Sequence, residues 1–212
     1  MICHDYINSY IRETIPKNEG LLAELEEFAQ LNHVPIVHPE VARLLVVLGN
    51  IKKPVRILEV GTAIGYSAIL MAGFLHSQGR IDTIERYELM VLRARENIKR
   101  AGLLDTINII QGEALDILSC LEKSYDMIFL DAAKGQYPEF LPECLRLLTS
   151  GGILVSDNVL YKGMVANSEL VVRRKKTIVK RMKDYLTAIC SDERLETSII
   201  PIGDGVAISY KK

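Results

Sequence analysis

The stretch Ile57-Leu58-Glu59-Val60-Gly61-Thr62-Ala63-Ile64-Gly65-Tyr66-Ser67 decides the fold of this chain. It begins as an apolar strand, continues as a turn with two glycines, and ends as the start of a helix. Glycines at such a turn let the backbone bend sharply and approach a bound nucleoside closely. Their spacing differs from the G-x-G-x-x-G pattern that holds a dinucleotide pyrophosphate. The stretch therefore favours a nucleoside cofactor without phosphates, such as S-adenosylmethionine, over NAD or FAD.

Alternating strands and helices extend outward from that turn. We expect strands at 56–60, 81–85, 107–111, 125–130 and 153–156, and helices from about residues 66, 88, 114 and 137. This alternation predicts a mostly parallel sheet that is covered by helices on both faces. Glu85 ends the second strand, about twenty residues after the turn, where an acid can accept hydrogen bonds from both ribose hydroxyls.

The two ends of the chain depart from the alternation. Residues 1–53 carry apolar side chains at helical spacing and predict an N-terminal helical extension. Near the other end, the apolar runs 198–202 and 206–209 flank Gly203-Asp204-Gly205, a tight-turn signal that predicts a terminal antiparallel hairpin. The expected fold is one α/β domain over residues 1–212, with a Rossmann-like, mostly parallel, seven-stranded sheet.

Polar residues follow two of the predicted strands. Asp131-Ala132-Ala133-Lys134 comes after one apolar run, and Asp157-Asn158 comes after the next. A segment of helical length separates them, so both strings should lie at the carboxyl ends of neighbouring parallel strands, where open α/β sheets bind ligands. Two carboxylates and an amide oxygen suit Mg²⁺ or a similar cation such as Mn²⁺ or Ca²⁺. Lys134 would place a titratable amine beside the oxygen that the metal binds.

Each polar string has an ordinary explanation when it is taken alone. An Asp-Asn pair after a strand is most often a turn that caps a helix, and Asp-x-x-Lys is more often a solvated ion pair. A metal site is favoured only because both strings end adjacent strands beside a glycine turn. The combination predicts an active site.

Composition limits the class of protein. A chain of 212 residues that is 49% hydrophobic can bury the core of one domain, and a net charge of −1 offers no global basic field for nucleic acid. The four cysteines lack paired spacing, which favours free thiols over disulfides or a zinc site. The start of the chain does not resemble a signal peptide, and its apolar runs are too short to span a bilayer. We therefore expect a cytoplasmic protein with no membrane partner.

One segment is strongly basic. Between Lys162 and Lys183 the only acid is Glu169. A solvated helix face is a common explanation for such a run. Because the run directly follows the second polar string, it could instead overhang the active site and meet the phosphates of a substrate. The candidate substrate contacts are Lys162, Arg173, Arg174, Lys175 and Lys176, with Tyr137 and Tyr161 as aromatic platforms for an exposed RNA base.

These motifs resemble those of the class I, metal-dependent O-methyltransferases, the family that includes catechol and caffeoyl-coenzyme A O-methyltransferases. The resemblance covers nearly the whole chain. It implies S-adenosylmethionine as methyl donor, Asp131, Asp157 and Asn158 as the metal ligands, and Lys134 with Asp131 as the catalytic residues. Glu113 replaces the Asp that most relatives carry. The implied cofactor contacts are Ile36, Glu59, Gly61, Thr62, Gly65, Tyr66, Ser67, Glu85, Glu113, Ala114 and Asp131.

Within the family, the strings 131–137, 157–163 and 201–209 resemble those of bacterial tRNA 5-hydroxyuridine methyltransferases. That resemblance implies a tRNA anticodon loop as substrate, 5-methoxyuridine at the wobble position as product, and a homodimer. The 5-hydroxyl and O4 of the base are vicinal, as in a catechol, and can chelate one cation together. Lys134 would take the hydroxyl proton if its pKa is lowered by the cation, or stabilise the oxyanion if it stays charged.

Two alternatives to a tRNA methyltransferase remain open at this point. The first is a small-molecule O-methyltransferase for catechols or acyl-coenzyme A phenols, with the same chemistry and a different acceptor pocket. The second is a nucleoside-binding oxidoreductase or a non-catalytic regulator on the same fold. The missing dinucleotide fingerprint and the complete metal set both disfavour the second alternative.

Overall fold

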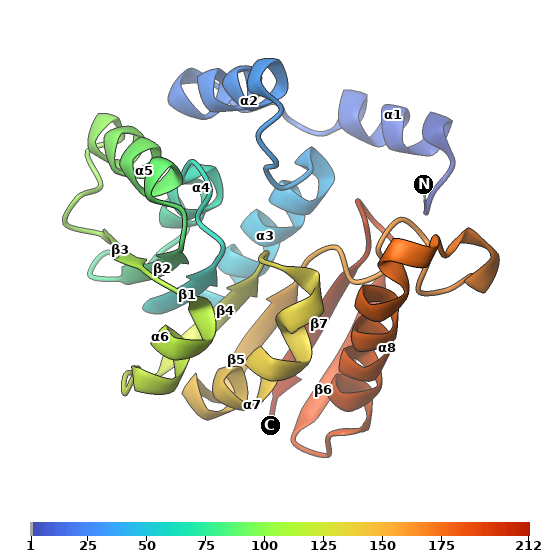
Figure 1. The fold of residues 1–212 in the computed structure, drawn as a ribbon. Coiled ribbons are helices and arrows are strands. Elements are labelled where there is room, and N and C mark those ends of the chain that lie inside the picture. Colours follow the sequence, from blue (N-terminus) through green and yellow to red (C-terminus); the bar gives the residue numbers. More distant parts are fainter. Residues whose placement is uncertain (1) are drawn as a thin grey trace.

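One sheet runs through the computed structural model, which describes residues 2–212 (Figure 1). Its order is β3-β2-β1-β4-β5-β7-β6, and β7 runs antiparallel to both of its neighbours while the other strands are parallel. The expected fold class and the terminal antiparallel hairpin are confirmed. The strands are β1 (Arg56–Val60), β2 (Arg80–Glu85), β3 (Ile107–Gln111), β4 (Tyr125–Leu130), β5 (Leu148–Ser156), β6 (Leu195–Ile200) and β7 (Val206–Lys211).

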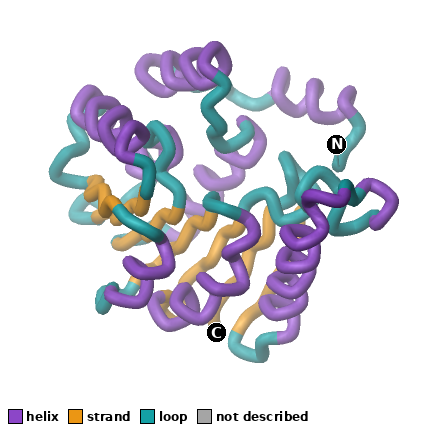
Figure 2. Tube along the Cα trace, viewed as in Figure 1, coloured by secondary structure: helices purple, strands orange, loops and turns teal. Residues whose placement is uncertain are grey.

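Helices cover both faces of the sheet, and the strands form a single layer between them (Figure 2). The predicted N-terminal extension consists of α1 (Asp5–Thr14), α2 (Gly20–Asn32) and α3 (Pro39–Lys52). The helices between strands are α4 (Tyr66–Ala72), α5 (Glu88–Arg100), α6 (Ala114–Cys120), α7 (Tyr137–Leu147) and α8 (Lys176–Ser191). In the described part of the chain, none of these helices is both long and apolar enough to cross a membrane.

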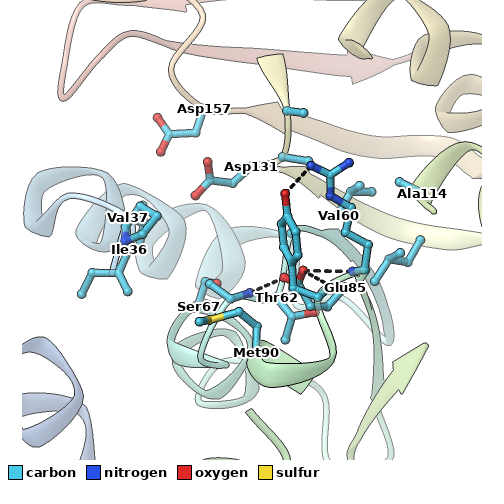
Figure 3. A pocket seen from close by; sticks show the side chains of 18 of the residues that line it. Ile36, Val37, Val60, Thr62, Ser67, Glu85, Met90, Ala114, Asp131 and Asp157 are labelled. Carbon is cyan, nitrogen blue, oxygen red and sulfur yellow. Dashed lines mark hydrogen bonds between the residues drawn. The ribbon is translucent and has the colours of Figure 1, made fainter. Parts of the chain in front are cut away.

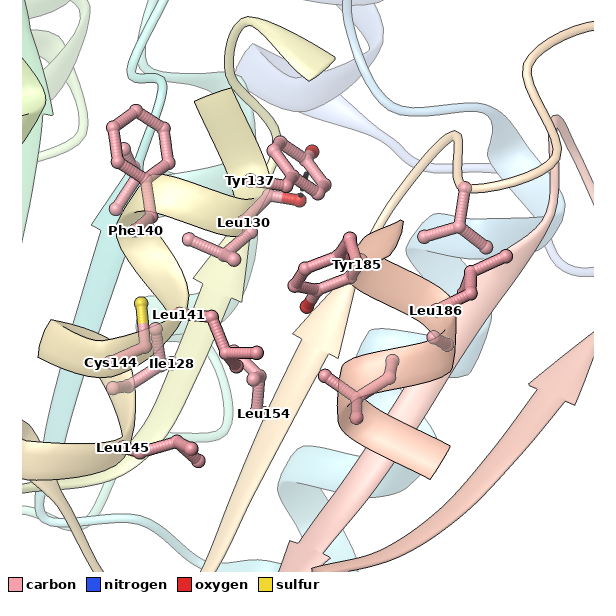
Figure 4. Packing of buried hydrophobic residues seen from close by; sticks show 14 of the residues in the cluster. Ile128, Leu130, Tyr137, Phe140, Leu141, Cys144, Leu145, Leu154, Tyr185 and Leu186 are labelled. Atoms are coloured by element: carbon pink, nitrogen blue, oxygen red, sulfur yellow. Dashed lines mark hydrogen bonds between the residues drawn. The ribbon is translucent and has the colours of Figure 1, made fainter. Parts of the chain in front are cut away.

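Successive side chains of the central strands point to opposite faces of the sheet, and this produces two hydrophobic cores. Leu58 and Ile128 belong to the cluster under α6, α7 and α8, whereas Ile57 and Met127 belong to the cluster under α2 to α5. In the first cluster, α7 and α8 pack over β4 and β5 with Tyr185 fully buried between them (Figure 4). Because both faces of β1 and β4 are covered, most of their residues are apolar, as in other buried parallel sheets, and Glu59 is a buried exception in β1.

The carboxyl ends of β1, β4 and β5 meet at one edge of the sheet. The strand register makes Gly61, Asp131 and Asp157 neighbours just beyond these ends. Backbone hydrogen bonds extend the ladder to them, from the Asp131 N–H to the Val60 oxygen at 3.0 Å and from the Asp157 N–H to the Leu130 oxygen at 2.9 Å. The polar residues are therefore placed by the sheet itself and not by a flexible loop.

The fifth strand starts earlier than expected, at Leu148 instead of residue 153. Leu148 pairs with Tyr125, and the register then shifts before Ile153 pairs with Met127. Gly151 has a φ of +75° within this irregular part of the strand. The Gly151-Gly152 pair interrupts the apolar pattern, which is why the sequence predicted only the regular half of β5.

Candidate active site

A cavity of about 800 Å³ opens along the carboxyl edge of the sheet (Figure 3). It is bounded by the glycine turn, the ends of β2, β4 and β5, the start of α6, and the connection between α2 and α3. Its size suits a nucleoside-sized ligand together with a small acceptor. The predicted residues that line it are Ile36, Gly61, Thr62, Tyr66, Ser67, Glu85, Glu113, Ala114, Asp131, Lys134, Asp157 and Asn158.

The glycine turn lies directly against the end of β4. Gly61 has a φ of +108°, and a Cβ at this position would lie 2.2 Å from the carbonyl oxygen of Asp131. The N–H groups of Gly61 and Thr62 both donate to the Ile84 oxygen, at 3.0 and 3.2 Å. Only glycine fits both the backbone conformation and the close approach. Gly65, also predicted as a cofactor contact, caps α4 and lies outside the cavity lining.

Glu85 is held rigidly at the end of β2. Its Oε2 accepts the Ala63 N–H at 2.9 Å, and its Oε1 accepts the N–H groups of Arg86 and Tyr87, both at 2.9 Å (Figure 3). The residue is 8% exposed and lines the cavity. The carboxylate is thus fixed where a ribose could reach it, and it also anchors the glycine turn to the end of β2.

Glu59 lies beneath the glycine turn and does not line the cavity. Its Oε2 accepts the Thr83 hydroxyl at 2.5 Å, and Thr83 in turn lies 2.6 Å from the Thr62 hydroxyl. Its Oε1 has no hydrogen-bond partner among residues 2–212. Complete burial raises the pKa of Glu59 to about 7. Glu59 therefore supports the turn from below, through two threonines.

Two carboxylates and a lysine meet at the ends of β4 and β5. Asp131 and Asp157 point into the same space (Figure 3), and Lys134 Nζ donates to Asp131 Oδ1 at 2.8 Å. Asp157 is fully buried, and its Oδ1 accepts the Asn158 N–H at 2.6 Å. Burial, together with the charge of Asp131, raises the pKa of Asp157 well above its usual range. The predicted metal residues and the predicted base are thus brought together.

This group of residues fits a divalent cation. Asp157 Oδ2 is buried and has no hydrogen-bond partner in the described chain, which is costly for a carboxylate oxygen unless a cation or a ligand satisfies it. Carboxylate and amide oxygens are the donors that hard cations prefer. Among residues 2–212, no group of three or more acidic, histidine or cysteine side chains is placed so that it could hold a metal ion by itself. The candidate set is therefore the predicted one, two carboxylates and the amide of Asn158.

The prediction that Tyr137 stacks on an exposed base is wrong. Tyr137 is fully buried at the start of α7, where its hydroxyl donates to the Leu130 oxygen at 2.9 Å and lies 3.1 Å from the Asp157 oxygen. A ring in this position is out of reach of a substrate. Its hydroxyl instead ties together the ends of the two strands that carry the metal candidates.

The predicted substrate contacts on the basic segment lie outside the cavity lining. Tyr161 is half-buried, and the Nζ of Lys175 lies 5.6 Å from the centre of its ring. Arg173, Arg174 and Lys176 are exposed and form no ion pair within the described residues. Their role in substrate binding stays a prediction.

Several lining residues were not predicted from the sequence. Arg86 and Tyr87 follow Glu85 directly, and Arg86 lies 3.6 Å from the Glu113 carboxylate. Their position in the sequence, directly after Glu85, could have indicated that they line the cavity. Val37 and His38 also line the cavity, but they come from the connection between α2 and α3. No local pattern marks that connection, because only tertiary packing brings it to the sheet edge.

Known proteins share this architecture and much of this sequence. The chain matches the model of the O-methyltransferase family over residues 12–212. A catechol O-methyltransferase from Niastella koreensis is 36% identical over 165 residues, which is 75% of each chain. A solved structure from Staphylococcus aureus, provisionally assigned as a caffeoyl-CoA O-methyltransferase, is 35% identical with a TM-score of 0.91, covering 98% of this chain and 100% of the other. The chain belongs to the O-methyltransferase family.

A more distant structure was determined with a cofactor. TomG from Streptomyces achromogenes, an O-methyltransferase in complex with SAM, is 26% identical with a TM-score of 0.86, covering 98% of this chain and 96% of that one. Family membership confirms the predicted class, the O-methyltransferases. The relatives from Niastella koreensis and Staphylococcus aureus are named for catechol and caffeoyl-CoA acceptors.

The buried Glu59 should make stability depend on pH. Its pKa of about 7 in the folded protein lies above the ordinary value of 4.5, so the folded state holds the proton more tightly than the unfolded state. The contribution of this group is complete below about pH 4.5 and is lost as the pH rises through about 7, a change of ~3 kcal/mol. The unfolding free energy of Glu59→Gln, relative to wild type, should therefore rise by about 3 kcal/mol between pH 4.5 and 8 in denaturant titrations. If the unfolding free energies of Glu59→Gln and wild type differ by the same amount at pH 4.5 and pH 8, the pKa of Glu59 is not raised in the folded protein.

Proposed function

We propose that this protein transfers a methyl group from S-adenosylmethionine to one of two vicinal oxygens of an acceptor, beside a divalent cation held by Asp131, Asp157 and Asn158. The observation that carries the proposal is the buried, unpaired Oδ2 of Asp157 next to Asp131. It lies in the same cavity as the glycine turn and Glu85. An all-oxygen cation site and a nucleoside site in one cavity suit metal-assisted methyl transfer.

The proposed position of the cofactor follows from the fixed groups of the cavity. The ribose hydroxyls would donate to Glu85, whose carboxylate is already oriented by three backbone N–H groups. Gly61 lets the turn lie directly against the end of β4, and Glu113 with Ala114 would flank the adenine. The SAM-bound structure of TomG supports the same donor here. This arrangement leaves the metal edge free for the acceptor.

The chemistry requires the acceptor hydroxyl to lose its proton. The oxygen forms a bond to the methyl carbon as the carbon–sulfur bond breaks, and the products are a methyl ether, S-adenosylhomocysteine and a proton. A divalent cation, when bound, supplies a Lewis acid that lowers the pKa of the hydroxyl. Lys134 Nζ lies 2.8 Å from Asp131 Oδ1, so it would face that hydroxyl. It either takes the proton as a free amine or stabilises the oxyanion as an ammonium.

A catechol-type small molecule is the first candidate acceptor. The cavity of about 800 Å³ can hold a nucleoside cofactor and a single aromatic ring together. The relatives are named for catechol and caffeoyl-CoA acceptors, which carry vicinal oxygens on an aromatic ring. These similarities support a small phenolic acceptor.

The 5-hydroxyuridine of a tRNA anticodon loop is the second candidate, and the position of the basic segment favours it. Arg181 in α8 donates to the Gly135 oxygen at 2.9 Å, so the basic helix is attached directly beside Lys134. The exposed cations Arg173 and Arg174, just before α8, and Lys176, at its start, would then lie on the acceptor side of the molecule. A protein with a net charge of −1 that concentrates basic residues here is suited to a phosphate-bearing substrate.

The cofactor site can be tested with Glu85→Ala. Loss of a charged acceptor for two ribose hydroxyls should weaken S-adenosylmethionine binding by about 2–3 kcal/mol in isothermal titration. Glu88→Ala, which removes an exposed acid from the first turn of α5, is the matched control and should bind normally. An unchanged dissociation constant for Glu85→Ala would show that the ribose lies elsewhere.

The metal site can be tested with Asp157→Ala. The variant should lose methyl transfer and bind Mg²⁺ or Mn²⁺ far more weakly, while S-adenosylmethionine still binds, because the glycine turn and Glu85 do not depend on the cation. Asp184→Ala, an exposed acid on α8, serves as the control and should keep both properties. Full activity of the wild-type protein in excess chelator would rule out the proposed mechanism.

The acceptor can be identified by offering both candidates to the purified protein with Mg²⁺ and S-adenosylmethionine. If tRNA is the substrate, Arg173→Gln/Arg174→Gln should weaken tRNA binding and lower the slope of log affinity against log salt by about one unit at most per lost contact. Arg95→Gln/Lys99→Gln, which neutralises two exposed residues of α5, should change neither quantity.

Mass spectrometry of the products decides between the two acceptors. Rapid methylation of a catechol, without measurable tRNA binding, supports the small-molecule acceptor. Methylation of 5-hydroxyuridine in tRNA supports the second candidate, and the double arginine variant should then still methylate a small vicinal diol, because the cation residues are untouched. If neither acceptor is methylated, both acceptor proposals are wrong.

A further inference from the structure

The loop that follows Asp157 has an unusual backbone. Six non-glycine residues of the described chain have positive φ angles, and three of them, Asn158 at +57°, Tyr161 at +45° and Lys162 at +58°, lie within this loop. Side chains other than glycine rarely adopt this conformation, because the Cβ crowds the backbone. Such strain persists only where the surroundings hold it, and it gathers at functional sites. Something must therefore hold residues 158–162 in place.

The turn of the C-terminal hairpin provides that support. The Val159 N–H donates to the Gly205 oxygen at 2.9 Å, and the Leu160 N–H donates to the Asp204 oxygen at 3.0 Å. The Lys162 N–H donates to the Asp204 side chain, at Oδ1, at 2.5 Å. Asp204 thus holds the loop with both its main chain and its side chain.

The hairpin does not need the Asp204 side chain for its own closure. The turn is closed by the Gly205 N–H, which donates to the Ile202 oxygen at 2.8 Å. The turn is also seated tightly, since a Cβ on Gly203 would lie 2.7 Å from Val41 of α3 and one on Gly205 would lie 2.5 Å from Leu160 of the loop. The turn is therefore wedged between α3 and the loop, in a position to fix one relative to the other.

The restrained loop joins the two functional parts of the acceptor side. Its first residue is Asn158, the amide candidate at the cation site. Further along the loop, the ring of Tyr161 lies beside the Lys175 ammonium, and the rest of the basic segment follows in the sequence. A shift of the loop would therefore move a cation ligand and the acceptor-side segment together.

We propose that Asp204 is a positioning residue, which accepts the Lys162 N–H and thereby fixes residues 158–162 so that Asn158 faces the cation site. The effect on the cation rests on the proposed function described above. The restraint of the loop does not, because it is a property of the chain alone. The Oδ1 hydrogen bond, and not the negative charge, carries the role.

Two variants separate the hydrogen bond from the charge. Asp204→Ala removes the acceptor, whereas Asp204→Asn keeps an oxygen at that position without the charge. Asp192→Ala is the matched control, since Asp192 Oδ1 accepts the Arg194 N–H at 2.9 Å in the connection between α8 and β6. In that contact too, a carboxylate oxygen accepts a backbone N–H, and it lies after the C-terminal end of α8. Three quantities are measured on each protein: hydrogen exchange of peptides covering 158–163, the dissociation constant of Mn²⁺, and that of S-adenosylmethionine.

We expect Asp204→Ala to exchange faster over 158–163 and to bind Mn²⁺ about tenfold or more weakly, the usual effect of losing a group that orients a ligand. S-adenosylmethionine should bind within about twofold of wild type, which shows that the variant is folded. Asp204→Asn and Asp192→Ala should resemble wild type in all three quantities.

Two results would overturn the inference. If Asp204→Ala shows the same hydrogen exchange over 158–163 and the same Mn²⁺ affinity as the wild-type protein, the loop needs no support from Asp204. If Asp204→Asn loses as much protection and Mn²⁺ affinity as Asp204→Ala, the charge of Asp204 matters and not its hydrogen bond. If wild-type protein binds no Mn²⁺, the proposed function fails, and the exchange of 158–163 alone then decides the role of Asp204.

Discussion

The contact between Gly61 and the carbonyl of Asp131 is the constraint on which the rest of the site depends. It holds the glycine turn after β1 directly against the end of β4, with no room for a side chain between them. Because β4 also pairs with β5, the same register that places the turn places Asp157. The proposed nucleoside site and the proposed cation site are therefore joined through adjacent backbone strands. Their separation is set by the pairing of the strands in the sheet.

Two buried carboxylate oxygens in the described chain have no hydrogen-bond partner, and both are at this edge of the sheet. Glu59 Oε1 lies beneath the glycine turn, and Asp157 Oδ2 lies at the cation edge. Buried acids with raised pKa values are unfavourable for stability, and they gather where a protein binds charged ligands. The two acids differ in role. Glu59 supports the turn through Thr83 and Thr62, whereas Asp157 faces the cavity itself.

The segments at the two ends of the chain surround this edge, although only the N-terminal one lines the cavity within the described residues. The connection between α2 and α3 forms one wall, and the turn of the terminal hairpin is wedged between α3 and the loop after Asp157. Helix α8 is attached beside Lys134 through Arg181. The proposed nucleoside side of the cavity thus depends on the central strands, and the proposed acceptor side depends on segments far apart in the sequence.

The sequence by itself determined most of the strands, their mostly parallel arrangement and the polar residues at their ends, because apolar runs and glycine turns are local signals. It also predicted Asp131, Lys134, Asp157 and Asn158 as one group, since parallel strands end at a common edge. Only the tertiary structure showed that Tyr137 is buried and that the Asp204 side chain braces the loop after Asp157. Those facts depend on how α7 and the hairpin turn pack against distant segments. Burial and long-range hydrogen bonds of this kind have no periodicity in the sequence.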